Sequence, residues 1–117
     1  MSGQEKINYI ELPASDLKAT KTFYSAVFGW VFADYGPDYV AFANSGLDGG
    51  FYRSSKKSVV AEGAALVVLY SKDLQQTQSK VVAAGGVIVK PVFSFPGGRR
   101  FHFTDPCGNE LAVWSEQ

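Results

Sequence analysis

The sequence predicts an α+β fold in which two βαβββ modules form curved mixed sheets around a central trough. Three observations predict it: short runs of apolar residues alternate as in strands, two segments have helical spacing, and the second half of the chain repeats the first. With 117 residues, of which 46% are hydrophobic and 19% charged, the chain has the composition of one compact domain.

The first predicted strand, residues 7–12, carries polar groups on one face. Side chains alternate along a strand, so Tyr9 and Glu11 project to one side and the apolar residues between them to the other. The alternation stops at Pro13, where we expect the strand to end.

A helix and three strands complete the first module, which spans about residues 6–53. Ser15 is placed to cap the helix, and Gly29 is placed to end it. Turn-forming Gly, Pro and Asp residues separate the strands, which are expected at residues 30–35, 39–43 and 50–53.

The second module, about residues 63–116, follows a polar and unpatterned stretch at about 54–62 that predicts a linker. The same elements return in the same order. We expect a strand at 65–70, a helix at 74–84 between a Ser71 cap and Gly85–Gly86, and strands at 87–92, 100–104 and 110–114. Asp105–Pro106–Cys107–Gly108 has the residue types of a type I turn.

An offset of 57 residues aligns the two modules. Over residues 9–32 it gives six identities, whereas roughly one or two are expected by chance. The identical pairs are Leu12/Leu69, Asp16/Asp73, Leu17/Leu74, Thr20/Thr77, Ala26/Ala83 and Gly29/Gly86. The two modules are therefore predicted to descend from a duplication.

The charge balance and the cysteine content predict which partners the protein does not bind and in which compartment it is found. Eleven basic residues balance eleven acidic ones, so we expect neither nucleic acid nor an acidic membrane surface as a partner. The single cysteine cannot form an internal disulfide, and neither a signal-peptide pattern nor a long apolar run occurs. These features favour a cytoplasmic protein.

Two segments carry a resemblance to a known family. They are INYIELPASDLKATKTFYSAVFGW, residues 7–30, and GGRRFHFTDPCGNELAVW, residues 97–114. In this order, and with the duplicated βαβββ unit, the chain resembles the vicinal oxygen chelate superfamily. That superfamily contains glyoxalase I, bleomycin-resistance proteins, fosfomycin-resistance enzymes and extradiol dioxygenases. The resemblance covers almost the whole chain.

The resemblance also indicates where a divalent metal would bind. Metal-dependent members use four side chains, usually His and Glu, on the first, fourth, fifth and eighth strands. The matching positions here are Tyr9, Gly50, Leu66 and Ala112. These residues lack the nitrogen and oxygen donors that such an ion needs, so we expect no cofactor.

The resemblance and these substitutions leave two functions open. The first is metal-independent binding of a small molecule in an aromatic trough. The alternative is a glyoxalase-type lyase or isomerase, or a dioxygenase-like enzyme, with a displaced divalent metal on Glu11, His102 and Glu110; metal-free acid–base catalysis by Glu11 and His102 belongs to the same alternative. Whether the protein is an enzyme therefore stays undecided.

The candidate site combines aromatic and polar residues on the predicted inner faces. Glu11 and His102 are the candidate catalytic residues. The candidate ligand-binding residues are Tyr9, Glu11, Phe51, Tyr52, Leu66, Arg100, His102, Glu110 and Trp114. Aromatic rings would stack on the ligand, and Arg100 would contact a carboxylate or phosphonate.

Each candidate also has a structural interpretation. Glu11 could form an ion pair with Arg100 instead, and His102 could be an ordinary hydrogen-bonded residue. The trough itself could be filled, which would make the protein an interaction module. The resemblance further implies a homodimer as the expected assembly.

Overall fold

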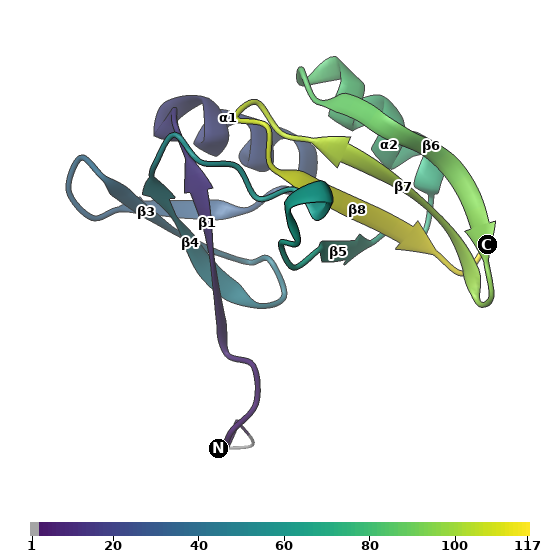
Figure 1. Cartoon of the computed structure of the whole chain (residues 1–117), viewed down its shortest axis with the longest axis horizontal. Helices are drawn as coiled ribbons and strands as arrows, with labels where there is room; N and C mark the ends of the chain where they lie inside the picture. The colour runs from purple at the N-terminus through teal and green to yellow at the C-terminus, as the bar shows by residue number, and fades with distance from the viewer. Residues whose placement is uncertain (1–2) are drawn as a thin grey trace.

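The computed structural model describes residues 3–117 and contains two four-stranded sheets (Figure 1). The strand orders are β1-β4-β3-β2 and β5-β8-β7-β6. β1 is parallel to β4, and β5 is parallel to β8. The predicted α+β fold of two βαβββ modules is thus confirmed. The elements are β1 (Tyr9–Ala14), α1 (Leu17–Phe28), β2 (Val31–Asp34), β3 (Tyr39–Ala43), β4 (Asp48–Arg53), the 3₁₀ turn η1 (Val60–Glu62), β5 (Val67–Tyr70), α2 (Leu74–Ala83), β6 (Val87–Phe95), β7 (Gly98–Thr104) and β8 (Glu110–Ser115).

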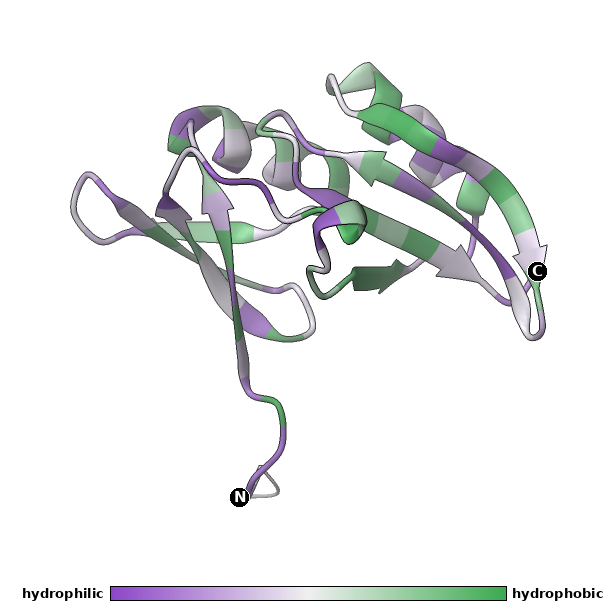
Figure 2. Cartoon of the chain, in the orientation of Figure 1, coloured by the Kyte–Doolittle hydropathy of each residue, from purple (hydrophilic) through white to green (hydrophobic). Residues whose placement is uncertain are grey.

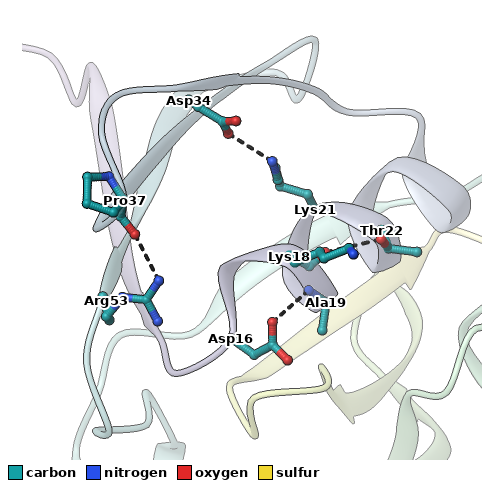
Figure 3. Close-up of polar contacts among 8 residues, drawn as sticks. All are labelled: Asp16, Lys18, Ala19, Lys21, Thr22, Asp34, Pro37 and Arg53. Carbon is teal, nitrogen blue, oxygen red and sulfur yellow. Dashed lines mark hydrogen bonds and ion pairs between the residues drawn. The ribbon is translucent and has the colours of Figure 1, made fainter.

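The two helices begin at equivalent aspartates, so the predicted caps at Ser15 and Ser71 were wrong. The Asp16 carboxylate accepts a hydrogen bond from the backbone N–H of Ala19 at 3.0 Å (Figure 3). Asp73 accepts the same bond at the start of α2, at 3.1 Å. A carboxylate here satisfies one of the free N–H groups of the first turn.

The threonines that follow the two caps are also equivalent. Thr20 donates to the carbonyl of Asp16 at 2.9 Å, and Thr77 donates to the carbonyl of Asp73 at 3.2 Å. The helix ends differ, because α1 ends at Gly29, as predicted, with a left-handed φ of 73° that suits glycine, whereas α2 ends at Ala84. The duplication therefore extends from sequence to local structure at the helix starts.

Two strands contain a proline and are longer than predicted: the first was expected to end at Pro13, and the other, which includes Pro91, at residue 92. β1 runs through Pro13 to Ala14, and β6 runs through Pro91 to Phe95. Both strands lie at sheet edges, so each needs a partner on one side only. A proline, which has no N–H to donate, is tolerated in an edge strand.

A single core lies between the sheets and the helices, which are on one side of the two sheets (Figure 1). Phe23 of α1 packs against Phe103 of β7 with ring centroids 6.0 Å apart, which joins the two modules. Tyr24 stacks on Trp30 at 4.7 Å. Hydrophilic and hydrophobic residues alternate along β7 (Figure 2), with Phe101 and Phe103 in the core. No helix within residues 3–117 is long and apolar enough to cross a membrane.

The predicted turn at Asp105 is a buried joint between the modules. Its backbone closes with a 2.9 Å bond from Gly108 N–H to Asp105 O, and the Asp105 carboxylate accepts hydrogen bonds from Tyr24 Oη at 2.8 Å and Asn109 N–H at 3.0 Å. Burial raises the pKa of Asp105, although these hydrogen bonds act in the opposite direction. Asn109 Nδ2 also donates to the carbonyl of Pro13 at 2.6 Å, which ties the turn to β1.

Candidate functional site

The second sheet has a face turned away from the helices that carries most of its polar and aromatic side chains. Neighbouring strands pair His102 with Ala112, Arg100 with Trp114, and Tyr70 with Trp114, so these residues project to the same side. We call this surface the β7–β8 face. Its members are Val68, Tyr70, Lys90, Phe93, Phe95, Arg100, His102, Glu110, Ala112 and Trp114.

Irregular pairing of β6 places part of this face. Lys90 pairs with His102, and Phe93 pairs with Arg100, but the register shifts between Ile88 and Lys90 and again between Lys90 and Phe93. Shifts of this kind insert extra residues into a strand and redirect its side chains. Lys90 and Phe93 of β6 thereby lie beside His102 and Arg100 of β7.

Aromatic rings form a row along one end of the β7–β8 face. Tyr70 and Trp114 meet nearly edge to face, with centroids 5.3 Å apart, and Phe95 lies 6.3 Å from Trp114. The Tyr70 hydroxyl bonds to the Glu116 carboxylate. Trp114 is half-buried, so part of its indole ring is available to a planar ligand.

Arg100 lies between two of the rings. Its guanidinium carbon is 5.3 Å from the centre of the Phe93 ring and 5.5 Å from that of Phe95, within cation–π range. The Lys90 ammonium lies over the same Phe93 ring at 5.0 Å. Within residues 3–117 neither cation forms an ion pair with a carboxylate.

His102, which is buried, and Glu110, which is partly buried, form a pair beside these cations. His102 is only 3% exposed, and its Nδ1 lies 2.9 Å from Glu110 Oε2. The other carboxylate oxygen accepts the N–H of Val60 at 3.2 Å, so the segment around η1 covers Glu110. Burial acts to raise the pKa of Glu110, but these hydrogen bonds and the charges of His102 and Lys90 outweigh it and lower that pKa.

The hydrogen-bond partner determines the orientation of the imidazole. A Glu110 carboxylate can only accept, so Nδ1 of His102 carries the proton. Nε2 of His102 and Nε of Arg100 are both buried, and neither has a hydrogen-bond partner among the residues that the structure describes. Buried polar atoms of this kind are uncommon because leaving them unpaired is costly.

The corresponding face of the first sheet is internally satisfied. Tyr39 Oη donates to Glu11 at 2.9 Å and lies 2.7 Å from Tyr9 Oη. The Tyr39 hydroxyl also occupies the space into which a side chain at Gly50 would project. Burial and its hydrogen bonds with Tyr9 and Glu11 raise the pKa of Tyr39.

The predicted site residues therefore separate into groups. Arg100, His102, Glu110 and Trp114 come together on the β7–β8 face, whereas Tyr9, Glu11 and Tyr52 lie on the first sheet. Leu66 is half-buried directly before β5. Phe51 is a correction: it is fully buried in the core, because its side chain points toward the helix from a strand on which Tyr52 points away. The ion pair considered between Glu11 and Arg100 is not formed.

Sequence reasoning missed four residues of the β7–β8 face: Tyr70, Lys90, Phe93 and Phe95. The predicted strand, residues 87–92, ended before Phe93 and Phe95, which hid these two residues. The alternation of Phe93 and Phe95 around a serine was a usable signal that the strand continued. The register shifts that position Lys90 leave no such signal in a single sequence.

Comparison with known proteins places this fold in a family. A model of the Glyoxalase/Bleomycin resistance protein/Dioxygenase superfamily matches residues 6–113. The chain belongs to this superfamily. Two curated relatives, each called "Putative glyoxylase CFP32" and from Mycobacterium bovis and Mycobacterium tuberculosis, are 25% identical over 92% of the chain. The chain spans only 44% of the length of these relatives.

Solved structures of the superfamily share the fold. A glyoxalase/bleomycin resistance protein/dioxygenase family enzyme from Burkholderia phytofirmans has a TM-score of 0.79 at 16% identity, covering 94% of this chain and 98% of that one. A glyoxalase-related enzyme from Fulvimarina pelagi has a TM-score of 0.77 at 20% identity, covering 95% and 88%. A lactoylglutathione lyase from Agrobacterium tumefaciens has a TM-score of 0.71 at 22% identity, covering 95% and 93%.

The residues at the metal positions of the superfamily do not fit a divalent ion. Ala112 presents a buried methyl group, and the space above Gly50 is occupied by Tyr39. The structure also does not bring Glu11 together with His102 and Glu110, and within residues 3–117 no three His, Cys, Asp or Glu side chains converge as a metal site requires.

Proposed function

We propose that this superfamily member is a metal-independent small-molecule-binding protein whose ligand binds on the β7–β8 face. The observation that carries the proposal is the buried His102 ring, whose Nε2 has no hydrogen-bond partner among residues 3–117 and whose ring centre lies 5.8 Å from that of Phe93. A ligand that hydrogen-bonds to Nε2 would remove the cost of this unpaired atom. Stacking on Trp114 would add apolar contact.

The hydrogen bonds of the oxygen atoms that could bind a metal support a function without one. Tyr9 and Glu11 are engaged with Tyr39, and both oxygens of Glu110 accept hydrogen bonds from the protein. Releasing these groups to a metal would break existing bonds. The purified protein should therefore contain no stoichiometric metal, and EDTA, Ni²⁺, Zn²⁺, Mn²⁺ or anaerobic Fe²⁺ should leave its unfolding midpoint unchanged. A stoichiometric metal or a clear rise of the midpoint would overturn the proposal, because binding to the folded state raises stability.

A screen of small molecules tests the binding face directly. His102 is the only histidine in the chain, so its ring protons give one assigned set of NMR signals without mutagenesis. There are two tryptophans, and Trp114 rather than the core residue Trp30 should respond to a ligand. Ligands that shift His102 and Trp114 together support the proposal. Binding that perturbs only other residues would contradict it.

Metal-free acid–base catalysis is a second candidate, favoured by the His102–Glu110 pair. Glu110 fixes the proton on Nδ1 and leaves Nε2 free to accept a proton from a substrate. Since one solved relative is called a lactoylglutathione lyase, the first substrate to test is the hemithioacetal of methylglyoxal and glutathione. Turnover that persists in EDTA and is lost in His102→Gln would establish catalysis. Its absence would leave binding as the function.

We also propose that the protein is a cytoplasmic homodimer. Apolar side chains are exposed on the face of the first sheet that points away from the helices, including Tyr9, Val31 and Tyr52. A second copy would cover them. Light scattering at micromolar concentration should give twice the mass of the chain, and the dimer should dissociate in Tyr52→Asp. A buried free thiol at Cys107 is compatible with a reducing compartment.

A further inference from the structure

We infer that the ligand of the β7–β8 face is an aromatic oxyanion, a planar ring bearing a carboxylate or phosphonate, with Arg100 and His102 holding the anionic group. This inference rests on the proposed function and names the class of its ligand. It depends on three features of the face: an unneutralised charge, a free imidazole nitrogen and the row of rings.

The charge comes from Arg100. Its guanidinium lies between Phe93 and Phe95, and among residues 3–117 it has no carboxylate partner and its buried Nε has no hydrogen-bond acceptor. The two rings restrict its position, so little side-chain freedom is lost when a ligand binds. A planar guanidinium held in this way matches an oxyanion with two parallel hydrogen bonds.

The nearby acidic group does not cancel this charge. Both oxygens of Glu110 are used, one by Val60 N–H and the other by His102. Lys90 adds a second positive charge on the same face, over the Phe93 ring. Arg100 and Lys90 against the one carboxylate of Glu110 leave one positive charge on the face while His102 is neutral, and two when its ring is protonated, which favours an anionic ligand.

His102 supplies the second contact to the anionic group. It lies two residues after Arg100 on β7, so the two side chains project from the same face. When the ring is protonated, Nε2 donates to an oxyanion while Glu110 accepts from Nδ1. The two unpartnered nitrogens of the face, Nε of Arg100 and Nε2 of His102, are both buried, so a ligand group that satisfies them must first displace the side chains that cover them.

The rings determine what the anionic group is attached to. Phe95 lies between Arg100 and Trp114. Its ring centre is 5.5 Å from the guanidinium carbon of Arg100 and 6.3 Å from the ring centre of Trp114. Tyr70 lies beyond Trp114. A flat ring over Trp114 therefore places its acidic substituent toward Arg100. Inorganic anions would make the polar contacts alone and lose the stacking, so they should bind more weakly.

Four probes test this inference with the full chain: benzoate, phenylphosphonate, the neutral benzamide and inorganic phosphate. Calorimetry and the NMR signals of His102 and Trp114 report binding. Benzoate and phenylphosphonate should bind about ten-fold or more tightly than benzamide, as expected for loss of a charge-assisted pair. Phosphate should shift His102 while leaving Trp114 unchanged.

Substitutions at two neighbouring positions of β7 test whether Arg100 is responsible for the preference for anionic ligands. Arg100→Met keeps an apolar stem between the rings and should weaken benzoate binding about ten-fold or more, with benzamide affected less than about two-fold. Arg99→Met is the matched control, because Arg99 donates to the Gln117 carbonyl on the other side of the strand, and it should bind benzoate as the wild type does. Arg100→Lys retains the charge and tests the planar geometry if Arg100→Met does not fold.

The outcomes separate this inference from the proposed function. Equal affinity for benzoate and benzamide, or equal losses in the Arg99 and Arg100 variants, would overturn the assignment of an oxyanion site. So would the failure of both aromatic anions to bind at millimolar concentration. If neutral compounds from the screen still shift His102 and Trp114, the proposed binding face stands with a different ligand class. If no compound shifts them, the proposed function fails as well.

Discussion

The two modules share their framework but differ in how they use the sheet faces turned away from the helices. In the first module Tyr9, Glu11 and Tyr39 satisfy one another, and Tyr39 fills the space above Gly50. In the second module His102 and Arg100 each keep a buried nitrogen without a partner among residues 3–117. The difference accords with the proposed function, in which the ligand binds on the second face and the first face is closed by its own side chains.

The equivalent hairpin turns show a second difference. The β3–β4 turn around Asn44 is largely exposed, whereas the β7–β8 turn inserts the Asp105 carboxylate into the core and bonds it to Tyr24 of the first module. The second module therefore contributes the joint that holds both together. Its removal should cost more than any change on the candidate binding face.

The largest expected effect is that of Asp105→Ala. The substitution leaves three buried donors, Tyr24 Oη and the backbone N–H groups of Cys107 and Asn109, without their acceptor, and removes one of the two bonds of Asn109 Nδ2. We expect a loss of about 3 to 5 kcal/mol in the free energy of unfolding, measured with urea. Ser45→Ala in the other hairpin, where the hydroxyl donates to the Leu47 carbonyl, should cost less than about 1 kcal/mol. Similar losses at the two turns would contradict the assignment of Asp105 as the joint.

The next effect tests the closed face. In Gly50→Ala the new methyl group meets the Tyr39 hydroxyl, so Tyr39 must move and lose its bonds with Tyr9 and Glu11. We expect a loss of about 1 to 3 kcal/mol in stability. In a Tyr39→Leu background the same substitution should cost less than about 1 kcal/mol, because the obstructing group is gone. Equal costs in both backgrounds would show that Tyr39 does not close this position.

Much of the framework was predictable because it depends on local rules. The alternation of residues 7–12 and the glycine at position 29 indicated the first strand and helix. Where the prediction failed, the cause was tertiary. Ser15 has the residue type of a helix cap, but in the structure Asp16 is the residue that lies beside the free N–H groups of the first turn. β1 continues through Pro13 because it lies at the edge of its sheet.

The candidate site was only partly predictable. Period-two reasoning placed Arg100, His102 and Trp114 on one face, which the strand pairing bears out. It could not show that Glu11, on the sheet of the first module, does not come together with His102 and Glu110, because alternation assigns a face within one sheet and says nothing of how two sheets are arranged. Nor could it show that Nε2 of His102 is unpartnered, since that depends on the side chains that β6 brings over the ring.

A smaller effect tests a feature that the two modules share, the aspartate cap at the start of each helix. Asp16→Ala and Asp73→Ala remove equivalent helix caps and should each cost about 1 kcal/mol. The two losses, measured by urea unfolding, should agree within about 0.5 kcal/mol and should add in the double variant. A loss at one cap more than about twice that at the other would show that the helix starts have diverged as the sheet faces have.

The smallest effect concerns Glu110, through which the second module orients His102. The pKa of Glu110 is lower in the folded chain, so folding favours its carboxylate form. The resulting stabilisation is complete above the unfolded pKa of about 4.3 and is lost as the pH falls through the lower folded value. Glu110→Gln should therefore reduce the unfolding free energy by less than about 1 kcal/mol near pH 6, and the difference from wild type should shrink below about pH 4.

Glu11→Gln in the first module is the matched control for this titration. Its side-chain oxygen still accepts the Tyr39 hydroxyl, and no histidine depends on it, so it reports the removal of a carboxylate without the loss of a pair with histidine. Guanidinium unfolding of wild type and both variants at pH 7, 5 and 3 separates the two sites. Because a carboxylate that holds His102 can act only while ionised, a Glu110→Gln difference that grows as the pH falls would show that another group orients the imidazole.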